Sequence, residues 1–410
     1  MTWPMSASPA CTGISVMQAI SRLSLAERPS QNNPMSHPDD PDLPPMRAAL
    51  ALAARHRGET WPNPSVGCVI LHNGRVVGRG VTAHGGRPHA EPQALAQAGT
   101  LAQGATAYVT LEPCCHHGRT PPCSDALMKA GIARVVVALR DPDPRVDGGG
   151  ITRLREAGIE VRTGVLEEEA ARVTAGFLHR VRYGRPRVTL KLASTLDGRI
   201  ATASGESQWI TGPQARHHVQ AVRARHDAIL TGIGTVLADD PSLTCRLTGG
   251  RQTPLLRLVA DSRLRMPLNA RMLHDGAGPV WILCADDADP ARRAALEQSG
   301  ARILPVPVAP ETGRLIIRTA LEQLGEAGLT WILVEGGGEI AAALLRGEHV
   351  DDIVWYHAPA IMGADGYPAT GALGLSTLSL MPRFHTVSTR AVGTDIVTEL
   401  RREETCSPAL

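Results

Sequence analysis

The pattern of apolar and polar positions divides the chain near residue 45. Residues 1–42 are rich in Pro, Ser, Asn and Asp and show no sustained hydrophobic period, which predicts a disordered extension. An ordered N-terminal arm is the alternative for this segment. From Pro45 onward, short apolar runs alternate with amphipathic stretches. Strands separated by helices imply mostly parallel sheets covered by helices on both faces, so the expected fold class is α/β.

The first half of this alternation contains one clear turn signal. The runs VGCVIL and VVGRGV are joined by His72-Asn73-Gly74, and Asn-Gly tolerates the positive φ angles of a hairpin turn, so we predict a β-hairpin. The other elements predicted here are, in order, a helix over 46–57, a helix after His89, a strand at TAYVTL, a helix after Cys123, a strand at RVVVAL, a helix at ITRLREAG, a strand at IEVRTGV and a helix of about fifteen residues from Glu167. The glycine run at 148–150 is expected to be a loop.

A break in the pattern at YGRPR marks the expected domain boundary near residue 185. We therefore predict a first domain at 43–185 and a second at 186–405, since 410 residues suffice for two or three domains of ~150 residues. The elements expected in the second domain are a helix at 213–225, strands near 228, 257, 281 and 331, a helix from Gly338 and a strand at DIVWYHAPAI.

Composition argues against several classes of function. A formal net charge of +2 and only 12 aromatic residues among 410 disfavour a nucleic-acid-binding surface. No apolar run approaches the ~18 to 20 residues of a membrane helix, so we expect no membrane partner. No secretory signal precedes the eight cysteines, which favours a reducing, cytoplasmic location.

The candidate chemistry is concentrated in LEPCCHHGRTPPC, residues 111–123, and in HAEPQAL, which begins at His89. Such a cluster is a metal site, a disulfide framework or chance. A catalytic zinc needs three protein ligands and an open fourth position, and His89, Cys114 and Cys123 supply that set. Cys123 follows two prolines at a predicted helix start, where the helix dipole favours the thiolate that binds metal.

Glu91 lies two residues after His89, near the metal but outside the ligand set. It is the natural proton shuttle for water activated by zinc, taking a proton during attack on a ring carbon and delivering it to the leaving amine. This pattern resembles the signature of zinc-dependent deaminases. The alternative is a closed structural zinc with Cys115 or His116 as fourth ligand, which would leave Glu91 without a purpose.

Longer stretches carry a family resemblance. NPSVGCVI, HAE and the two cysteines separated by eight residues resemble the N-terminal deaminase domain of the bifunctional deaminase/reductases of riboflavin biosynthesis, whereas nucleic-acid deaminases usually have two residues between the cysteines. The resemblance implies a cytidine-deaminase-like three-layer α/β/α fold and a substrate contact at Asn63, whose carboxamide can read a pyrimidine edge. Cys115 departs from the serine expected at that position.

The second half resembles the reductase part of the same family, whose fold is similar to dihydrofolate reductase. The resemblance rests on KLASTLDGRIA, SGESQWITG, TGIGTVLADDPSLTCR and LVEGGGEIAAALL, and with the first half it covers about residues 45–402. By itself, VEGGGEI predicts a strand that ends in glycines before a helix, where a phosphate can approach the helix N-terminus. A tight turn without a ligand remains open, because the run does not match G-x-G-x-x-G.

The resemblance also implies the site residues of the reductase half. NADPH contacts are expected at Ala193, Trp209, Thr235, Asp239, Ser262, Gly337, Gly338, Glu339, Ile340, Ala341, Ala342 and Ala343. Substrate contacts are expected at Ser207, Arg223, Leu243, Arg246 and Glu335. Arg223 and Arg246 can bind a sugar phosphate bidentately. The candidates to polarise or protonate the sugar are Lys191, Asp239 and Glu335, and Lys191 is one of only two lysines in the chain.

The implied function is two successive steps of riboflavin synthesis on small phosphorylated pyrimidines. Deamination with one Zn²⁺ per deaminase domain converts the diamino-ribosylamino-pyrimidinone phosphate to the aminouracil, and NADPH then reduces its ribosyl group to ribityl. The family suggests a homodimer or homotetramer formed through the reductase half. The competing hypotheses are a tRNA or single-strand deaminase with an appended domain, and a non-enzymatic protein with a structural zinc and a binding module.

Overall fold

The structure, a computed structural model, describes residues 39–118 and 120–403. The expected extension lies outside the described residues except for its last four. Those four do not fit the prediction of disorder, because Asp42 is buried and pairs with Arg134 and Arg162, each at 2.8 Å or less, while Tyr108 donates a hydrogen bond to it at 2.9 Å. These interactions tie the start of the first helix to the sheet.

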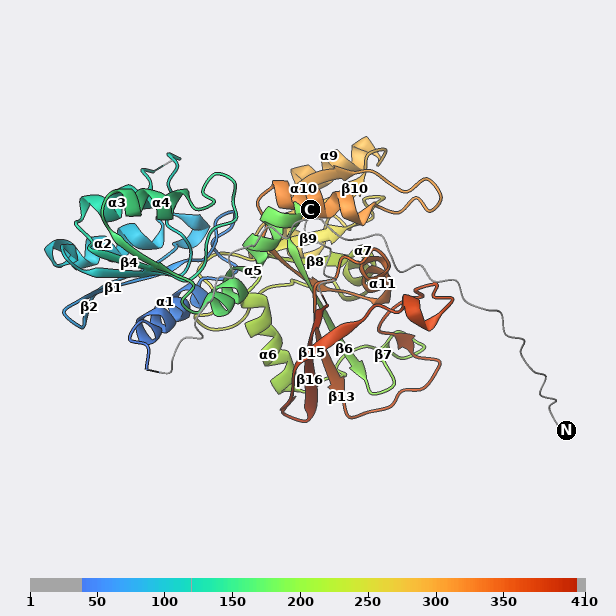
Figure 1. Ribbon diagram of the computed structural model, residues 1–410. Coiled ribbons are helices and arrows are strands. Elements are labelled where there is room, and N and C mark those ends of the chain that lie inside the picture. The colour runs from blue at the N-terminus through green and yellow to red at the C-terminus, as the bar shows by residue number, and fades with distance from the viewer. Residues whose placement is uncertain (1–38, 119, 404–410) are drawn as a thin grey trace, which may run out of the picture.

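The first domain is built on a five-stranded sheet (Figure 1). Its strands are β1 (Gly67–His72), β2 (Arg75–Val81), β3 (Thr106–Val109), β4 (Arg134–Val137) and β5 (Glu160–Thr163), in the order β2-β1-β3-β4-β5. The predicted hairpin is confirmed, with φ of 51° at Asn73 and 75° at Gly74. Only β3, β4 and β5 are parallel, so the expectation of a mostly parallel sheet is wrong for the half of this sheet that the hairpin builds.

Helices cover both faces of this sheet, which confirms the three-layer α/β/α fold. The helices are α1 (Leu43–Arg55), α2 (Ala90–Ala98), α3 (Cys123–Lys129), α4 (Gly149–Glu156) and α5 (Glu167–Tyr183). Alternate side chains of β1 face opposite layers: Ile70 packs with α2, α3 and α4, whereas Val69 packs with α1. Gly80 lets α2 approach β2 closely, because a Cβ there would stand 1.9 Å from the carbonyl oxygen of Ala90.

The expectation of a loop at the glycine run 148–150 is wrong. Gly148 caps α4 with a φ of 86°, and the next two glycines form its first turn. A Cβ on Gly150 would stand 2.0 Å from the carbonyl oxygen of Pro113, so this helix packs directly on the loop that carries the cysteines. The glycines are needed for close approach of two backbones.

The second domain is built on a nine-stranded sheet in the order β11-β10-β9-β8-β12-β6-β13-β16-β15. Its strands are β6 (Arg187–Thr195), β8 (Ala228–Gly232), β9 (Leu256–Ala260), β10 (Val280–Ala285), β11 (Ala301–Val306), β12 (Trp331–Glu335), β13 (Asp352–Ala358), β15 (Phe384–Val392) and β16 (Asp395–Arg402). All neighbours from β11 to β13 are parallel, and β16 and β15 add an antiparallel edge. A separate ribbon pairs β7 (Arg199–Ala201) with β14 (Tyr367–Pro368).

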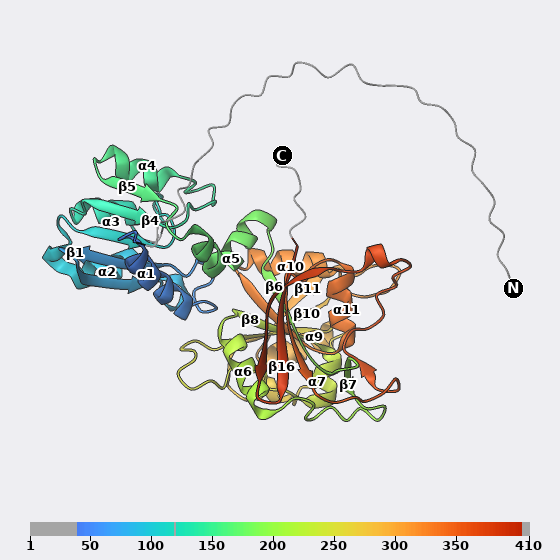
Figure 2. The ribbon, with the colours of Figure 1, turned by 60° about the horizontal axis from the view of Figure 1, so that its bottom comes forward.

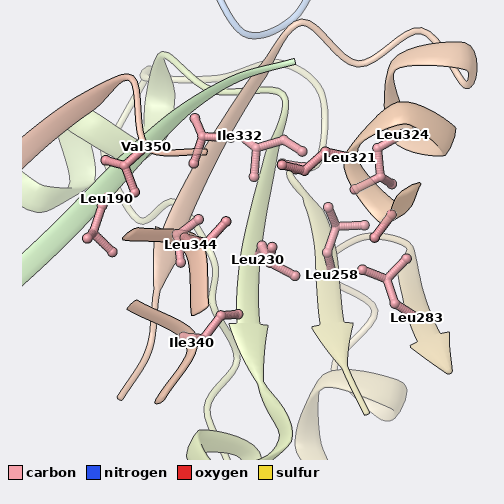
Figure 3. Packing of buried hydrophobic residues seen from close by; sticks show 14 of the residues in the cluster. Leu190, Leu230, Leu258, Leu283, Leu321, Leu324, Ile332, Ile340, Leu344 and Val350 are labelled. Carbon is pink, nitrogen blue, oxygen red and sulfur yellow. The ribbon is translucent and has the colours of Figure 1, made fainter. Parts of the chain in front are cut away.

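Helices pack on both faces of this sheet as well. They are α6 (Pro213–Ala224), α7 (Ile233–Asp239), α8 (Arg271–His274), α9 (Pro290–Gln298), α10 (Ile317–Glu326) and α11 (Gly338–Arg346). Short 3₁₀ turns occur at η1 (His84–Gly86), η2 (Gly99–Ala102) and η3 (Leu378–Leu380). One core lies between the sheet and α10 and α11, where Leu230 and Leu258 pack against Leu321 and Leu344 (Figure 3).

Helix α5 lies between the two domains in both views (Figures 1 and 2). It ends at Tyr183, and β6 begins at Arg187, on either side of the boundary expected near residue 185. The loop after α1 contacts the second domain, where Arg251 donates to the carbonyl oxygen of Gly58 at 3.0 Å. The same loop also contacts α5, where Arg180 donates to the carbonyl oxygen of Pro62 at 2.9 Å. Within the described part of the chain, no helix is long and apolar enough to span a membrane.

Candidate active sites

The fold brings His89, Cys114 and Cys123 together at the starts of two helices. His89 caps α2 in extended conformation, and Cys123 opens α3 directly after Pro122. The Nδ1 atom of His89 lies 3.7 Å from Sγ of Cys114 and 3.4 Å from Sγ of Cys123. Donors bound to one tetrahedral zinc at about 2.0 to 2.3 Å lie about 3.6 Å apart, so this donor set fits zinc.

The two thiols differ in their proton affinity. The backbone N–H of Cys123 donates to Sγ of Cys114 at 3.3 Å. The hydrogen bond from the Cys123 thiol, together with that from His89, lowers the pKa of Cys114 to about 4 despite partial burial. Holding the proton against that neighbouring thiolate raises the pKa of Cys123. A pair that already favours one thiolate is suited to a divalent metal, because metal binding releases thiol protons.

Glu91 lies buried in the first turn of α2, with 3% of its side chain exposed. Burial, and then the negative charge of Cys114, raise the pKa of Glu91 to about 6. A carboxyl group with a pKa close to neutrality is suited to accept and return a proton at physiological pH. Glu91 thus lies beside the ligands and outside the cluster, and its role as a proton shuttle stays a prediction.

Neither proposed fourth ligand joins the cluster. The group of possible metal ligands in residues 39–118 and 120–403 contains His89, Cys114 and Cys123 alone. The thiol of Cys115 instead lies 3.7 Å from the carbonyl oxygen of Arg145. The structural-zinc hypothesis that uses Cys115 therefore has no support in the geometry.

Asn63 lies in the wall of the zinc site. Its Nδ2 donates to the carbonyl oxygen of Gly86 at 2.8 Å and lies 3.4 Å from Nε2 of His89. Asn63 thus lies close enough to the predicted metal ligand to contact a substrate there, and its role as a substrate contact stays a prediction.

The sequence interpretation missed Glu112, which fixes the cysteine loop. This buried carboxylate accepts hydrogen bonds from the backbone N–H groups of Asp141, Gly148 and Ile151, at 3.2, 3.1 and 3.0 Å. The available signal was a glutamate directly after a buried strand and two residues before a ligand. A glutamate is rarely buried without a partner, so one placed beside a buried strand indicates a structural hydrogen-bond acceptor.

In the second domain, the residues predicted for the cofactor lie at the carboxyl ends of four adjacent parallel strands. Ala193 is in β6, Gly337 follows β12, Thr235 is in the helix after β8 and Ser262 follows β9. This edge is where open α/β sheets bind ligands. Gly337 caps α11 and has no atom within 4 Å of a Cβ position, which leaves room for a phosphate at the helix N-terminus. The predicted strand, glycine turn and helix are confirmed.

Lys191 and Glu335 are direct neighbours in adjacent strands, since β12 pairs with β6 in that register. Glu335 is buried and pairs with Arg223 at 2.7 and 3.0 Å. Burial alone would raise the pKa of Glu335, but Arg223 and then Lys191 outweigh it and lower that pKa. Burial lowers the pKa of Lys191. The result is a carboxylate beside an ammonium that gives up its proton more readily than a surface lysine.

Arg223 is less available than the sequence suggested. Two of its nitrogens are engaged by Glu335, and Nη1 donates to the carbonyl oxygen of Thr244 at 2.6 Å. Arg246 is exposed, and its backbone N–H donates to Oε1 of Gln220 at 2.8 Å, while its guanidinium makes no hydrogen bond within residues 39–118 and 120–403. The geometry therefore favours Arg246 over Arg223 as the freer phosphate ligand.

The other predicted residues are dispersed around this edge. Leu243 is buried, Ser207 is half-buried, and Trp209 is 68% exposed with its ring 4.7 Å from Arg216. Asp239 is exposed at the end of α7 and, among the described residues, makes no hydrogen bond or ion pair with Lys191 or Glu335. The residues brought together are thus Lys191, Glu335 and Arg223, and Asp239 stands apart.

Both halves of the chain match known protein families. The family of the cytidine and deoxycytidylate deaminase zinc-binding region matches residues 41–139, and the RibD C-terminal domain family matches residues 186–398. The riboflavin biosynthesis protein RibD of Escherichia coli K12 is 45% identical over 367 residues, covering 87% of this chain and 98% of its own length. That of Bacillus amyloliquefaciens is 42% identical over 352 residues, covering 86% and 94%.

Solved structures are similar to this chain over most of its length. RibD of Acinetobacter baumannii, form 1, is 39% identical with a TM-score of 0.79, and covers 88% of this chain and 99% of its own. A diaminohydroxyphosphoribosylaminopyrimidine deaminase/5-amino-6-(5-phosphoribosylamino)uracil reductase of Thermotoga maritima is 34% identical with a TM-score of 0.76 and the same coverage.

Proposed function

This chain belongs to the RibD family of bifunctional deaminases and reductases of riboflavin biosynthesis, and from that premise we propose how its own residues divide the two reactions. The enzyme deaminates the diamino-ribosylamino-pyrimidinone phosphate with zinc and then reduces the ribosyl group of the aminouracil product with NADPH. We assign deamination to residues 43–185 and reduction to residues 186–405.

The observation that carries the deaminase assignment is the cluster of three ligands beside a buried carboxyl group. His89, Cys114 and Cys123 would hold the zinc, which would lower the pKa of a bound water molecule toward ~7. Glu91 takes a proton from the attacking water as the new C–O bond forms at the ring carbon. It delivers that proton to the amine as the C–N bond breaks and ammonia leaves. Asn63 orients the pyrimidine edge.

The reductase assignment rests on the adjacent Lys191 and Glu335 at the cofactor edge. NADPH, when bound at the N-terminus of α11, supplies a hydride. As C1′ of the ribosyl group gains hydrogen, the C1′–O4′ bond breaks and O4′ needs a proton. Lys191 donates it, and Glu335 holds Lys191 in its charged form while Arg223 fixes Glu335. The cofactor contacts at Ala193, Trp209, Thr235, Asp239, Ser262 and 337–343 are part of this proposal, as are the substrate contacts at Ser207, Leu243 and Arg246.

The same premise extends to assembly and location. We place the enzyme in the cytoplasm, as a homodimer or homotetramer formed through the reductase half, with no nucleic-acid or membrane partner. The relatives that match over most of the chain are RibD proteins, so neither a nucleic-acid deaminase nor a non-enzymatic module gains support.

One assay tests both assignments and their order. Purified protein receives the pyrimidine substrate with and without NADPH, and ammonia release and NADPH oxidation are followed in the same tube, before and after zinc removal. We expect ammonia without NADPH, no ammonia without zinc, and NADPH oxidation only after deamination. Ammonia release with no NADPH consumption would remove the roles given to Lys191 and Glu335.

A further inference from the structure

A cavity of about 870 Å³ lies beside α5 and is lined by residues of both domains. Arg57 and Arg140 line it from the deaminase side, α5 forms one wall, and the starts of β6, β12 and β13 form the other. The zinc ligands and the Lys191–Glu335 pair do not line it. We call this the inter-domain cavity, and its volume lies within the range of small-molecule sites, about 300 to 1,000 Å³.

The walls of the inter-domain cavity carry a large excess of positive charge. Seven arginines line it against two carboxylates, Asp352 and Glu399. Both carboxylates are already engaged: Asp352 is shared by Arg187 at 2.6 Å and Arg401 at 3.3 Å, and Glu399 pairs with Arg390 at 2.9 Å. Asp352 thus neutralises part of the charge of Arg187 and Arg401, but neither cavity carboxylate forms an ion pair with Arg57, Arg182 or Arg225 in the described ranges.

Arg57, Arg182 and Arg225 have no carboxylate partner among residues 39–118 and 120–403. Nε of Arg57 reaches only the carbonyl oxygen of Arg225, at 3.4 Å, and its guanidinium lies 4.4 Å from the ring centroid of Trp331. Burial, and then the charge of Arg225, lower the pKa of Arg57 to about 10. The nearby charges of Asp352 and Asp227 offset only part of this unfavourable environment, which an anionic ligand would relieve further.

The wall formed by α5 combines apolar side chains with Arg172 and Arg182. Ala171, Ala175 and Leu178 of α5 face the cavity. Beside them the buried His179 has an Nε2 atom that makes no hydrogen bond in the described part of the chain. A site lined by both arginines and apolar side chains suits an organic anion better than a bare inorganic ion.

We propose that the inter-domain cavity binds a phosphorylated small organic molecule, with its phosphate between Arg57 and Arg225 and its body along the apolar side chains of α5. Guanidinium groups bind phosphate through charge-assisted, bidentate hydrogen bonds. A ligand in this place contacts both domains, so it stabilises their assembled arrangement by mass action. The proposal uses no residue of either active site. It rests on the proposed function only for the choice of ribose 5-phosphate, the fragment that both substrates share, as a probe.

Protection from arginine modification tests the proposal at residue resolution. The full-length zinc-loaded protein, saturated with NADPH, is treated with phenylglyoxal in the presence of ribose 5-phosphate or inorganic phosphate, and the modified peptides are quantified by mass spectrometry. We expect ribose 5-phosphate to slow modification of Arg225 and Arg57 several-fold, while Arg318, which is 76% exposed and outside the cavity, reacts at an unchanged rate. Equal protection by inorganic phosphate would identify the phosphate group as the recognised element. Modification of Arg225 at the same rate at every probe concentration would overturn the proposal.

A pair of variants separates this site from the two active sites. Arg225→Gln should weaken binding of ribose 5-phosphate at the protected site about tenfold, because it removes one charge-assisted contact. Arg318→Gln, the matched control, should leave binding unchanged. Both variants should keep wild-type rates of deamination and reduction at saturating substrate. Because the protection experiment requires no turnover, a failure of the proposed function would not alter its outcome.

Discussion

Glu59 of the deaminase domain accepts two hydrogen bonds from Thr253 of the reductase domain, one from its backbone N–H at 2.7 Å and one from its hydroxyl at 2.9 Å. The backbone N–H of Gln252 donates a third at 2.8 Å, and the carboxylate is only 4% exposed. Four residues later the same loop carries Asn63, and ten residues before Thr253 the reductase loop carries Leu243. One buried contact thus joins the two segments predicted to hold the two substrates.

Replacing Glu59 with alanine should loosen this contact. The change leaves three part-buried donors without this acceptor, and at the lower end of the usual cost, about 1 kcal/mol each, we expect the free energy of unfolding to fall by about 3 kcal/mol. The KM for deamination should rise, because Asn63 is no longer held in place. Urea denaturation and steady-state kinetics measure the two effects. Glu311→Ala, which removes an exposed glutamate, is the matched control, and an unfolding midpoint equal to wild type in Glu59→Ala would show that the contact does not fasten the domains.

Glu91→Gln should separate metal binding from proton transfer. The amide keeps the shape of the side chain but cannot accept the proton of the attacking water, so deamination should fall by about 10² to 10⁴ while the zinc content stays at one per chain. Reduction of the aminouracil, supplied already deaminated, should proceed at the wild-type rate. Zinc analysis and separate assays of deamination and of reduction check this. Full deamination by the variant would contradict the proton-shuttle role of Glu91 and favour a structural zinc site.

The adjacent cysteines provide a matched pair for the metal. Cys114→Ser should lose zinc and deamination, because it removes one of three ligands. Cys115→Ser should keep both, because that thiol lies against the carbonyl oxygen of Arg145. Metal content after dialysis is the measurement. Loss of zinc from both variants would place Cys115 within the coordination shell and contradict the geometry.

The two lysines of the chain provide a similar pair for the reductase. Lys191→Met should lower the rate of NADPH oxidation by about 10² or more, since it removes the proton donor beside Glu335. Lys129→Met, at an exposed position in α3, should have no effect on reduction. Steady-state assays of NADPH oxidation with the deaminated pyrimidine measure both rates. Equal rates in the two variants would exclude a proton-donor role for Lys191.

The sequence predicted those features whose physical cause lies within a few neighbouring residues. The hairpin at Asn73-Gly74 and the helix starts at His89 and Cys123 follow from two or three neighbouring residues, and the structure contains them. The helix at ITRLREAG was predicted, but its first turn at Gly149 and Gly150 was not, because the need for a glycine at 150 comes from Pro113, which is 37 positions away and contacts Gly150 only in the folded state.

Long-range pairs could not be derived in this way. The partners Arg223 and Glu335 are 112 positions apart, and Glu59 and Thr253 are 194 apart. Taken alone in the sequence, each of these residues would be predicted to be an ordinary exposed charged or hydroxyl side chain. Their burial depends on which strands become neighbours and on how the domains meet, and no short window of sequence contains that information.

Acid should destabilise the region where the domains meet, through His226. This histidine is 2% exposed, with Nδ1 2.7 Å from the carbonyl oxygen of Val222 and Nε2 2.9 Å from the hydroxyl of Thr189. Burial, and then the nearby charge of Arg57, lower the pKa of His226 to about 3. The unfolded chain binds a proton near pH ~6.5. The stability that depends on the neutral ring is therefore complete above that pH and is lost as the pH falls from about 6.5 toward about 3.

The size of this effect is set by the difference between the two pKa values. Between pH 6.5 and pH 5, each unit costs up to about 1.4 kcal/mol, so wild type should lose about 2 kcal/mol more unfolding free energy than His226→Gln over this interval. The comparison with the variant is needed because His179, whose pKa burial lowers to about 4, adds a slope of the same sign to both proteins. Urea unfolding at several pH values gives both curves. Parallel curves would mean that His226 titrates alike in the folded and unfolded chain, which is incompatible with a buried neutral ring.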